Sequence, residues 1–216
     1  MTDFAALREA MVERQIAARG LRDAPLLAAM REVPREAFVP AAVREFAYED
    51  GPLPIEAGQT ISQPYIVALM IAAAGVAPGS RVLEIGAGSG YAAAVMSRIA
   101  GEVIAVERHG ELADLAAARM ATLGYRNVRI VSGDGSAGWP DSAPYDAIIA
   151  AASGRHVPET LRRQLKIGGA LVMPIGAPGE MQSLFRVTRQ AEDAWEQENL
   201  GAVRFVPLIG EEGWQE

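Results

Sequence analysis

Hydrophobic residues in the first third of the chain recur at intervals of three and four among arginines and glutamates. This spacing predicts an amphipathic helix over residues 4–18. Asp23 is a candidate N-cap for a second helix, because a proline follows in its first turn. Further expected elements are a short helix near residues 41–46, a loop rich in proline and glycine at 50–58, and a helix from 64 to about 74.

From residue 76 onward, short apolar runs alternate with helical stretches. This rhythm predicts an α/β fold with a doubly wound, mostly parallel sheet. The expected strands are residues 81–83, 102–107, 127–132, 145–150 and 170–174, with a helix at 159–165. Two alternating segments at 182–188 and 202–207, joined by a polar loop, predict an antiparallel C-terminal edge. We expect one domain over residues 1–216, with a helical cap (1–75) and a ligand-binding sheet (76–216).

A glycine-rich turn follows the first expected strand, where residues 84–90 are Glu-Ile-Gly-Ala-Gly-Ser-Gly. Glycines let the backbone turn tightly and approach a ligand closely. A dinucleotide site has the spacing Gly-x-Gly-x-x-Gly, which brings pyrophosphate to a helix N-terminus. Here the spacing is Gly-x-Gly-x-Gly, with Glu84 two residues before Gly86. This pattern resembles motif I of the class I, Rossmann-like methyltransferases that use S-adenosylmethionine, although such turns also serve purely structural purposes.

Two more acidic residues stand at successive strand ends. Glu107 ends the second strand, where a carboxylate can accept hydrogen bonds from two ribose hydroxyls. Asp134 follows the third strand and could accept the amino group of an adenine. Taken singly, Glu107 could be a solvated strand end and Asp134 part of an ordinary Asp-Gly turn. Three such signals in order indicate an S-adenosylmethionine site.

Composition narrows the range of partners. A net charge of −7 argues against a nucleic-acid partner, which usually requires clustered lysines and arginines. The chain has no cysteine and only two histidines, which are far apart, so we expect no disulfide and no metal site. It shows neither a signal peptide nor an apolar run of ~18 residues, so we expect no membrane partner. We therefore expect a cytoplasmic protein, and a monomer.

The chain resembles the bacterial protein-L-isoaspartate O-methyltransferases over nearly its whole length. The matching segments are Met11–Ile16, Val33–Pro40, Ala47–Asp50, Gly58–Pro64, Arg81–Tyr91, Ala143–Ile149, Leu165–Gly169 and Val203–Leu208. The most specific segment is Thr60-Ile61-Ser62, because class I methyltransferases in general share motif I but not this sequence.

The resemblance implies a repair enzyme that methylates the free carboxylate of L-isoaspartyl residues in damaged proteins, giving an ester that collapses to a succinimide. It implies that Ser62 is the active-site residue. It also implies a cofactor pocket made of Gln59, Thr60, Ile61, Glu84, Gly86, Gly88, Glu107, Asp134 and Gly135. From spacing alone, Ser62 could instead cap the helix that begins near Pro64. The alternative activity is methylation of a small-molecule carboxylate.

One loop departs from the family pattern. Residues 151–154 are Ala-Ala-Ser-Gly, where the family usually has Ala-Ala-Ala-Pro. Arg155, which follows, could steer a carboxylate or could be an ordinary solvated arginine. A carboxylate acceptor has a pKa near ~4 and is already ionised at neutral pH, so no general base is required.

Overall fold

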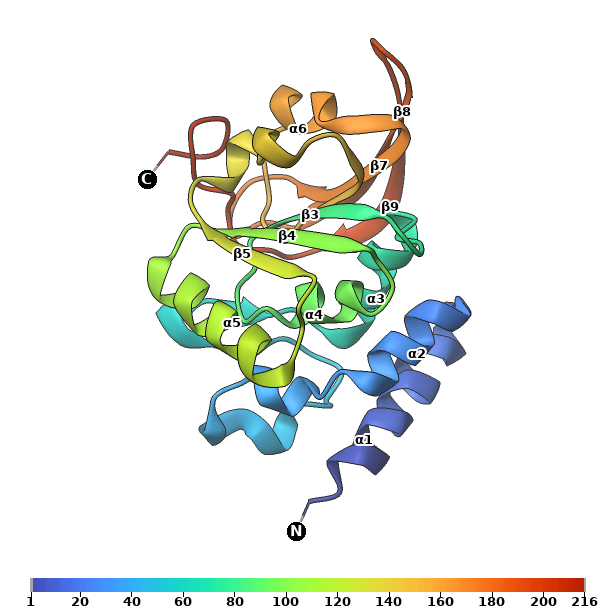
Figure 1. Cartoon of the computed structure of the whole chain (residues 1–216), viewed down its shortest axis with the longest axis vertical. Coiled ribbons are helices and arrows are strands. Elements are labelled where there is room, and N and C mark those ends of the chain that lie inside the picture. The colour runs from blue at the N-terminus through green and yellow to red at the C-terminus, as the bar shows by residue number, and fades with distance from the viewer. Residues whose placement is uncertain (1, 216) are drawn as a thin grey trace.

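A seven-stranded sheet forms the centre of the computed structural model, which describes residues 2–215 (Figure 1). The strand order is β5-β4-β3-β6-β7-β8-β9. Neighbours from β5 to β7 are parallel, and β8 and β9 add antiparallel to β7. The strands are β3 (Arg81–Ile85), β4 (Glu102–Glu107), β5 (Val128–Ser132), β6 (Tyr145–Ala150), β7 (Leu165–Ile175), β8 (Gln182–Ala191) and β9 (Ala194–Val203). The predicted fold class is confirmed.

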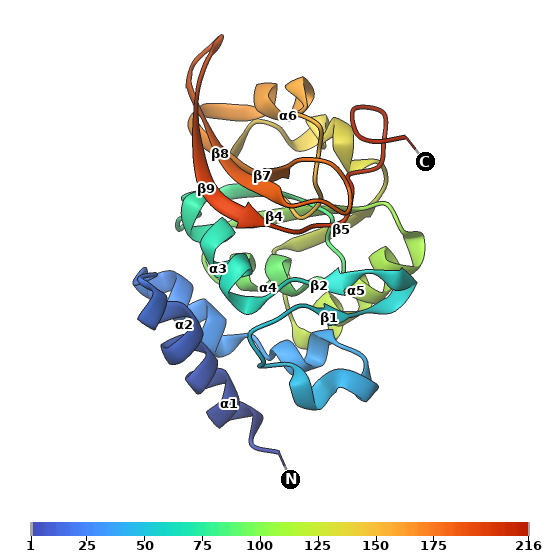
Figure 2. The same ribbon diagram turned by 180° about the vertical axis from the view of Figure 1, so that it is seen from behind.

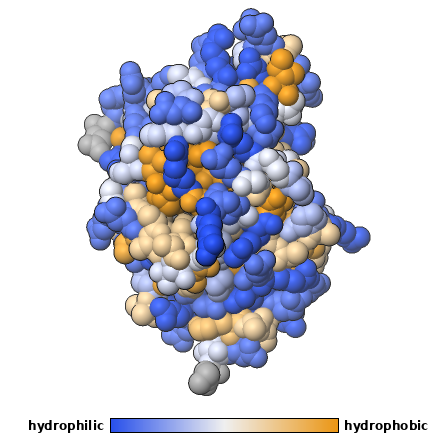
Figure 3. Space-filling model, viewed as in Figure 1, coloured by the Kyte–Doolittle hydropathy of each residue, from blue (hydrophilic) through white to orange (hydrophobic). Residues whose placement is uncertain are grey.

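Hydrophobic cores lie on both faces of the sheet, because successive side chains of each strand point to opposite sides. Val82 and Val103 face one core, which also contains side chains of the N-terminal helices, whereas Leu83 and Ile104 face the other core. The helices of the sheet region are α3 (Pro64–Ala73), α4 (Tyr91–Ser97), α5 (Gly110–Leu123) and α6 (Glu159–Arg163). On the face seen in Figure 1 hydrophilic residues predominate, with hydrophobic ones gathered near its centre (Figure 3).

The N-terminal residues form a helical cap at the lower end of the molecule (Figures 1 and 2). Helix α1 (Phe4–Met11) continues as a π-helical turn (Val12–Ile16), and a 3-10 turn follows, so the predicted helix is present but not regular throughout. Helix α2 (Ala24–Glu32) begins as predicted, because Asp23 accepts a hydrogen bond from the Leu26 N–H at 2.8 Å. Buried cap side chains belong to the same core as one face of the sheet.

The predicted loop at 50–58 contains a short strand that the sequence did not reveal. Strand β1 (Leu53–Pro54) pairs antiparallel with β2 (Thr60–Ile61). This two-stranded ribbon holds the segment that leads into α3. Gln63 is the N-cap of α3 and makes no side-chain capping hydrogen bond, so the alternative that Ser62 caps this helix is wrong.

The C-terminal hairpin is longer than predicted, and its second strand lies elsewhere. The predicted antiparallel edge is confirmed, but strand β9 is Ala194–Val203, so it shares only residues 202–203 with the predicted strand at 202–207, and most of the expected polar loop is strand. The polar composition misled the prediction because β9 is an edge strand with mostly exposed side chains. Likewise, the predicted helix at 159–165 ends at Arg163, because Leu165 already begins β7.

Candidate active site

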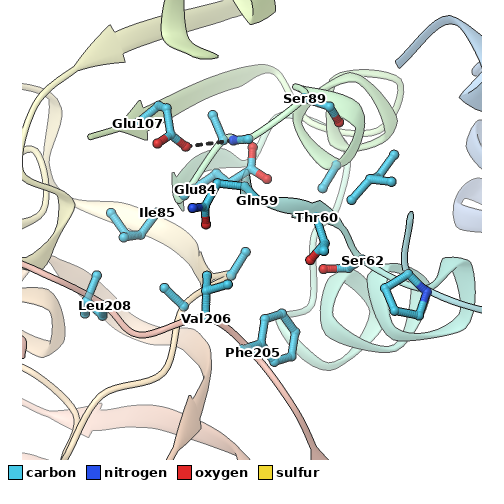
Figure 4. Close-up of a pocket in the computed structure, with 18 of the residues that line it drawn as sticks. Gln59, Thr60, Ser62, Glu84, Ile85, Ser89, Glu107, Phe205, Val206 and Leu208 are labelled. Carbon is cyan, nitrogen blue, oxygen red and sulfur yellow. Dashed lines mark hydrogen bonds between the residues drawn. The ribbon is translucent and has the colours of Figure 1, made fainter. Parts of the chain in front are cut away.

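A cavity of about 780 Å³ opens at the carboxyl ends of β3 and β4, where parallel sheets of this kind bind ligands. Its volume falls in the range of ~300–1,000 Å³ that is typical of small-molecule sites. Most of its lining comes from four segments: residues 59–63, 84–89, 106–109 and 202–209. Figure 4 shows Glu107 and Ser62 on opposite sides of this pocket, with Phe205, Val206 and Leu208 along a third side.

The glycine-rich turn between β3 and α4 forms one wall. Gly86 has a φ of 85° and its N–H donates to the Val106 carbonyl at 2.8 Å, which ties the turn to the end of β4. A side chain is disfavoured at this φ. Gly135 is required for a different reason, since a Cβ there would lie 2.6 Å from Cγ2 of Ile85. All three predicted glycines, Gly86, Gly88 and Gly135, line the pocket.

The Glu107 carboxylate lies at the end of β4, buried at the pocket wall and 4% exposed. One oxygen accepts the Gly88 N–H at 2.8 Å (Figure 4), and the other accepts the His109 N–H at 2.9 Å. These contacts fix the carboxylate while leaving each oxygen able to accept a second hydrogen bond. The alternative of a solvated strand end is wrong.

Glu84 lies at the pocket in β3, next to the glycine turn, and is 1% exposed. Its Oε2 atom is buried and has no hydrogen-bond partner among residues 2–215. Burial raises the pKa of this carboxyl well above its usual value, and the negative charge of Glu107 raises it further. A buried acidic oxygen without a partner suits a ligand that brings a cationic donor, such as the amino group of a methionine moiety.

The segment Gln59–Ser62 lines the pocket, and Figure 4 shows its Thr60 and Ser62 on the side away from Glu107. Ile61 is buried, which anchors the strand, while Thr60 is exposed on its other side. The Ser62 side chain is half-buried, and within the described residues its hydroxyl makes no hydrogen bond. The hydroxyl is therefore available to a ligand.

Comparison with known proteins agrees with this geometry. The profile of the protein-L-isoaspartate(D-aspartate) O-methyltransferase family matches residues 6–213. The chain belongs to this family. A protein-L-isoaspartate O-methyltransferase 1 from Rhodopseudomonas palustris (strain HaA2) is 62% identical over 99% of this chain and 87% of the relative. A protein-L-isoaspartate O-methyltransferase from Protochlamydia amoebophila is 53% identical over 95% of this chain and 98% of the relative.

Solved structures give the same result. A protein-L-isoaspartate O-methyltransferase superposes with a TM-score of 0.84 at 33% identity, covering 95% of this chain and 66% of that one. A Plasmodium falciparum protein described as a protein-L-isoaspartate O-methyltransferase, in complex with S-adenosyl-L-homocysteine, gives a TM-score of 0.80 at 26% identity, covering 94% of this chain and 98% of that one. The chain is thus a repair methyltransferase that uses S-adenosylmethionine and acts on isoaspartyl residues of proteins.

Of the residues predicted to form the cofactor pocket, only Asp134 does not line the cavity. Its carboxylate accepts the Ser136 N–H and the Glu211 N–H, each at 2.8 Å, so it caps a 3-10 turn and holds the C-terminal loop. Neighbouring Gly135 does line the pocket. The contact of Asp134 with adenine stays a prediction.

Sequence reasoning missed the wall formed by residues 205–208. The Gln182 side-chain amide accepts a hydrogen bond from the Phe205 N–H at 2.8 Å and donates one to the Phe205 carbonyl at 3.0 Å. The backbone of Ser153 makes two more hydrogen bonds to this wall: its N–H donates to the Val206 carbonyl and its carbonyl accepts the Leu208 N–H, both at 2.8 Å. The loop at residues 151–154, whose sequence departs from the family pattern, thus attaches this wall to the sheet. The apolar residues of the wall were visible in the sequence, but they were assigned to a strand.

Arg155 has no part in the pocket wall. It is exposed, and its guanidinium lies 4.3 Å from the ring centre of Trp214. Among residues 2–215 no cluster of three or more acidic or histidine side chains could hold a metal ion. No described helix is long and apolar enough to cross a membrane.

Proposed function

We propose that Ser62 orients the isoaspartyl carboxylate for methyl transfer. The observation that carries this proposal is the free Ser62 hydroxyl, which lies at the pocket on the side opposite Glu107 (Figure 4). A hydroxyl can donate one hydrogen bond to a carboxylate oxygen, which fixes its direction of attack. Among residues 2–215 the Ser62 hydroxyl makes no hydrogen bond to a histidine that could act as its base, so it acts by positioning.

We propose that the cofactor is held between two acidic residues. Glu107 would accept the ribose hydroxyls through its remaining acceptor positions, and Glu84 would accept the amino group through its unpartnered Oε2. The glycine turn allows the ligand to approach the backbone between them. Gln59, Thr60 and Ile61 would border the methyl group, since their segment faces this turn across the pocket.

Bound S-adenosylmethionine supplies an electrophilic methyl group on a sulfonium. The acceptor is already an anion at neutral pH, because carboxyl groups have reference pKa values near ~4. The protein therefore has to align the two groups and exclude water, and alignment alone contributes up to ~7–11 kcal/mol in well-oriented reactions. Phe205, Val206 and Leu208 provide an apolar wall beside the acceptor.

The pocket and the hydrophobic core also bear on the domain organisation and the oligomeric state of the enzyme. We propose that residues 1–75 and 76–216 act as one domain, because cap and sheet share a hydrophobic core and both contribute to the pocket. We also propose a monomer, since one chain supplies every wall of the pocket, and a location in the cytoplasm. Sedimentation of the purified enzyme and fractionation of cells test these two statements.

The activity test compares two peptides that differ only in one linkage. A peptide with an L-isoaspartyl residue and its normal aspartyl twin are incubated with labelled S-adenosylmethionine. We expect label only in the isoaspartyl peptide. Equal labelling of both peptides would leave a general carboxyl methyltransferase, and labelling of neither would remove the proposed acceptor.

A further inference from the structure

Arg35 is a buried arginine in the helical cap. It begins a 3-10 helix, η3 (Arg35–Phe38), and its side chain is 0% exposed. Within residues 2–215 no carboxylate pairs with its guanidinium. Arginine is rarely buried without an acidic partner, because removing its charge from water is costly.

The contacts of Arg35 lead to the active site. Its Nη2 donates to the Ser62 carbonyl at 2.8 Å, and its Nε donates to the Ala47 carbonyl at 2.7 Å. Its guanidinium carbon lies 4.9 Å from the ring centre of Tyr91, which is the first residue of α4 after the glycine turn. One side chain thus joins the cap, the Ser62 segment and the start of the helix that follows the glycine turn.

The remaining atom of the guanidinium makes this arrangement costly for stability. Nη1 is buried and has no hydrogen-bond partner in the described chain. Burial lowers the pKa of Arg35, which reflects the cost of keeping the charge inside. Well-packed apolar residues often stabilise such a position as much as a buried charge does, or more. The arginine therefore calls for a functional explanation, and its bond to the Ser62 backbone supplies one.

We propose that Arg35 is a positioning residue for methyl transfer. Its fork fixes the Ser62 peptide, so that the hydroxyl points at the acceptor carboxylate, and its unpaired positive charge behind that peptide favours an anion in front of it. This inference rests on the proposed role of Ser62. It predicts that Arg35 acts on turnover only through Ser62.

The test is a double-mutant cycle between Arg35→Met and Ser62→Ala. Methionine fills a similar volume without charge or donors. We expect Arg35→Met to lower kcat/KM for an isoaspartyl peptide by at least ~10-fold. We expect the affinity for S-adenosylhomocysteine to stay within about twofold, because Arg35 does not line the pocket. The double variant should be no slower than Ser62→Ala alone, because coupled residues give non-additive losses.

Arg8→Met is the matched control. Arg8 also lies in the cap and donates to the Tyr48 hydroxyl at 2.7 Å and to Glu36 at 3.0 Å, but it has no contact with Ser62. This variant should lose thermal stability and keep its kcat. A general effect of loosening the cap would lower kcat in both arginine variants, and that result would overturn the proposal.

Other outcomes also decide the matter. If the losses from Arg35→Met and Ser62→Ala multiply, Arg35 acts independently of Ser62 and this inference alone fails. If Ser62→Ala keeps wild-type turnover, the role of Ser62 fails first. Should Arg35→Met not fold, Arg35→Lys, which keeps the charge but loses the fork, replaces it in the same cycle. Failure of both to fold would mean that Arg35 serves the fold, which contradicts the proposal.

Discussion

The Asp134 carboxylate accepts a hydrogen bond from the Glu211 N–H at 2.8 Å, across 77 positions of the chain. The loop that follows β5 is thereby joined to the loop around residue 211. The neighbouring Ser136 hydroxyl accepts the Glu212 N–H at 3.0 Å. The Asp134 attachment involves an ionisable carboxylate, so its contribution to stability depends on pH.

Replacing Asp134 should therefore have an effect that depends on pH. Burial alone would raise the pKa of Asp134, but the hydrogen bonds from Glu211 and Ser136 outweigh it and lower the pKa below 3.8. A lowered pKa means that the stabilisation is present at neutral pH and disappears as pH falls through the folded-state pKa. We expect Asp134→Asn to lower the free energy of unfolding by ~1 kcal/mol at pH 7 and by less near pH 3. Denaturant titrations at both pH values measure it. Ser136→Ala should lose a smaller part of the same pH-dependent stabilisation, because the Ser136 side chain also lowers the pKa of Asp134.

Glu107→Ala should weaken cofactor binding by ~1–3 kcal/mol, because charge-assisted hydrogen bonds to hydroxyls are lost. Part of that loss comes from the Gly88 N–H, which Glu107 also holds. Glu107→Gln separates the two, since an amide keeps one acceptor oxygen but not the charge. Calorimetry with S-adenosylhomocysteine gives the affinities. Unchanged affinity in the alanine variant would show that Glu107 does not bind the ribose hydroxyls.

Glu84→Gln should have opposite effects on stability and on binding. The folded-state pKa of Glu84 is raised, so its ionised form is penalised by folding, and this cost grows as pH rises above the ordinary pKa. The glutamine variant lacks that cost and should melt at a higher temperature than the wild type at neutral pH without ligand. It should also bind S-adenosylhomocysteine more weakly by ~1.5–3 kcal/mol, because the charged partner of the amino group is gone. A variant that binds as tightly as the wild type would show that Glu84 does not contact the cofactor.

Ser62→Ala should reduce turnover strongly while leaving cofactor affinity nearly intact. The hydroxyl makes no hydrogen bond within residues 2–215, so its removal leaves the segment in place. Single-turnover rates with an isoaspartyl peptide, alongside calorimetry with S-adenosylhomocysteine, separate the two quantities. Wild-type turnover in a folded variant would refute the role of Ser62.

Turnover should lack a steep acid limb between about pH 6 and 8, because an ionised carboxylate needs no base. The measurement uses saturating cofactor and an isoaspartyl peptide with no other titrating group. Loss of the methyl ester must be corrected for, because esters hydrolyse faster as pH rises. A fall of ~10-fold from pH 8 to pH 6 in folded, saturated enzyme would mean that a base has been overlooked.

The sequence predicted those parts of the molecule whose pattern is local. The strands around the glycine turn, the Asp23 cap and the position of Glu107 each follow from neighbouring residues, and the structure has all of them. Strand β9 was misplaced because an edge strand needs no apolar face. The bond from Asp134 to Glu211 and the burial of Arg35 depend on residues far away in the chain, so no local pattern could reveal them.

The wall formed by residues 205–208 has a consequence for truncated forms of the chain. The glycine turn and the Ser62 segment lie within residues 59–92, whereas this wall comes much later in the sequence. Two backbone hydrogen bonds fasten it to the loop at Ser153, and both need residues 206–208. A fragment that stops before residue 205 would keep the cofactor side of the pocket but lose the apolar side beside the carboxylate. Such a fragment of this repair enzyme should still bind S-adenosylhomocysteine while losing the transfer reaction.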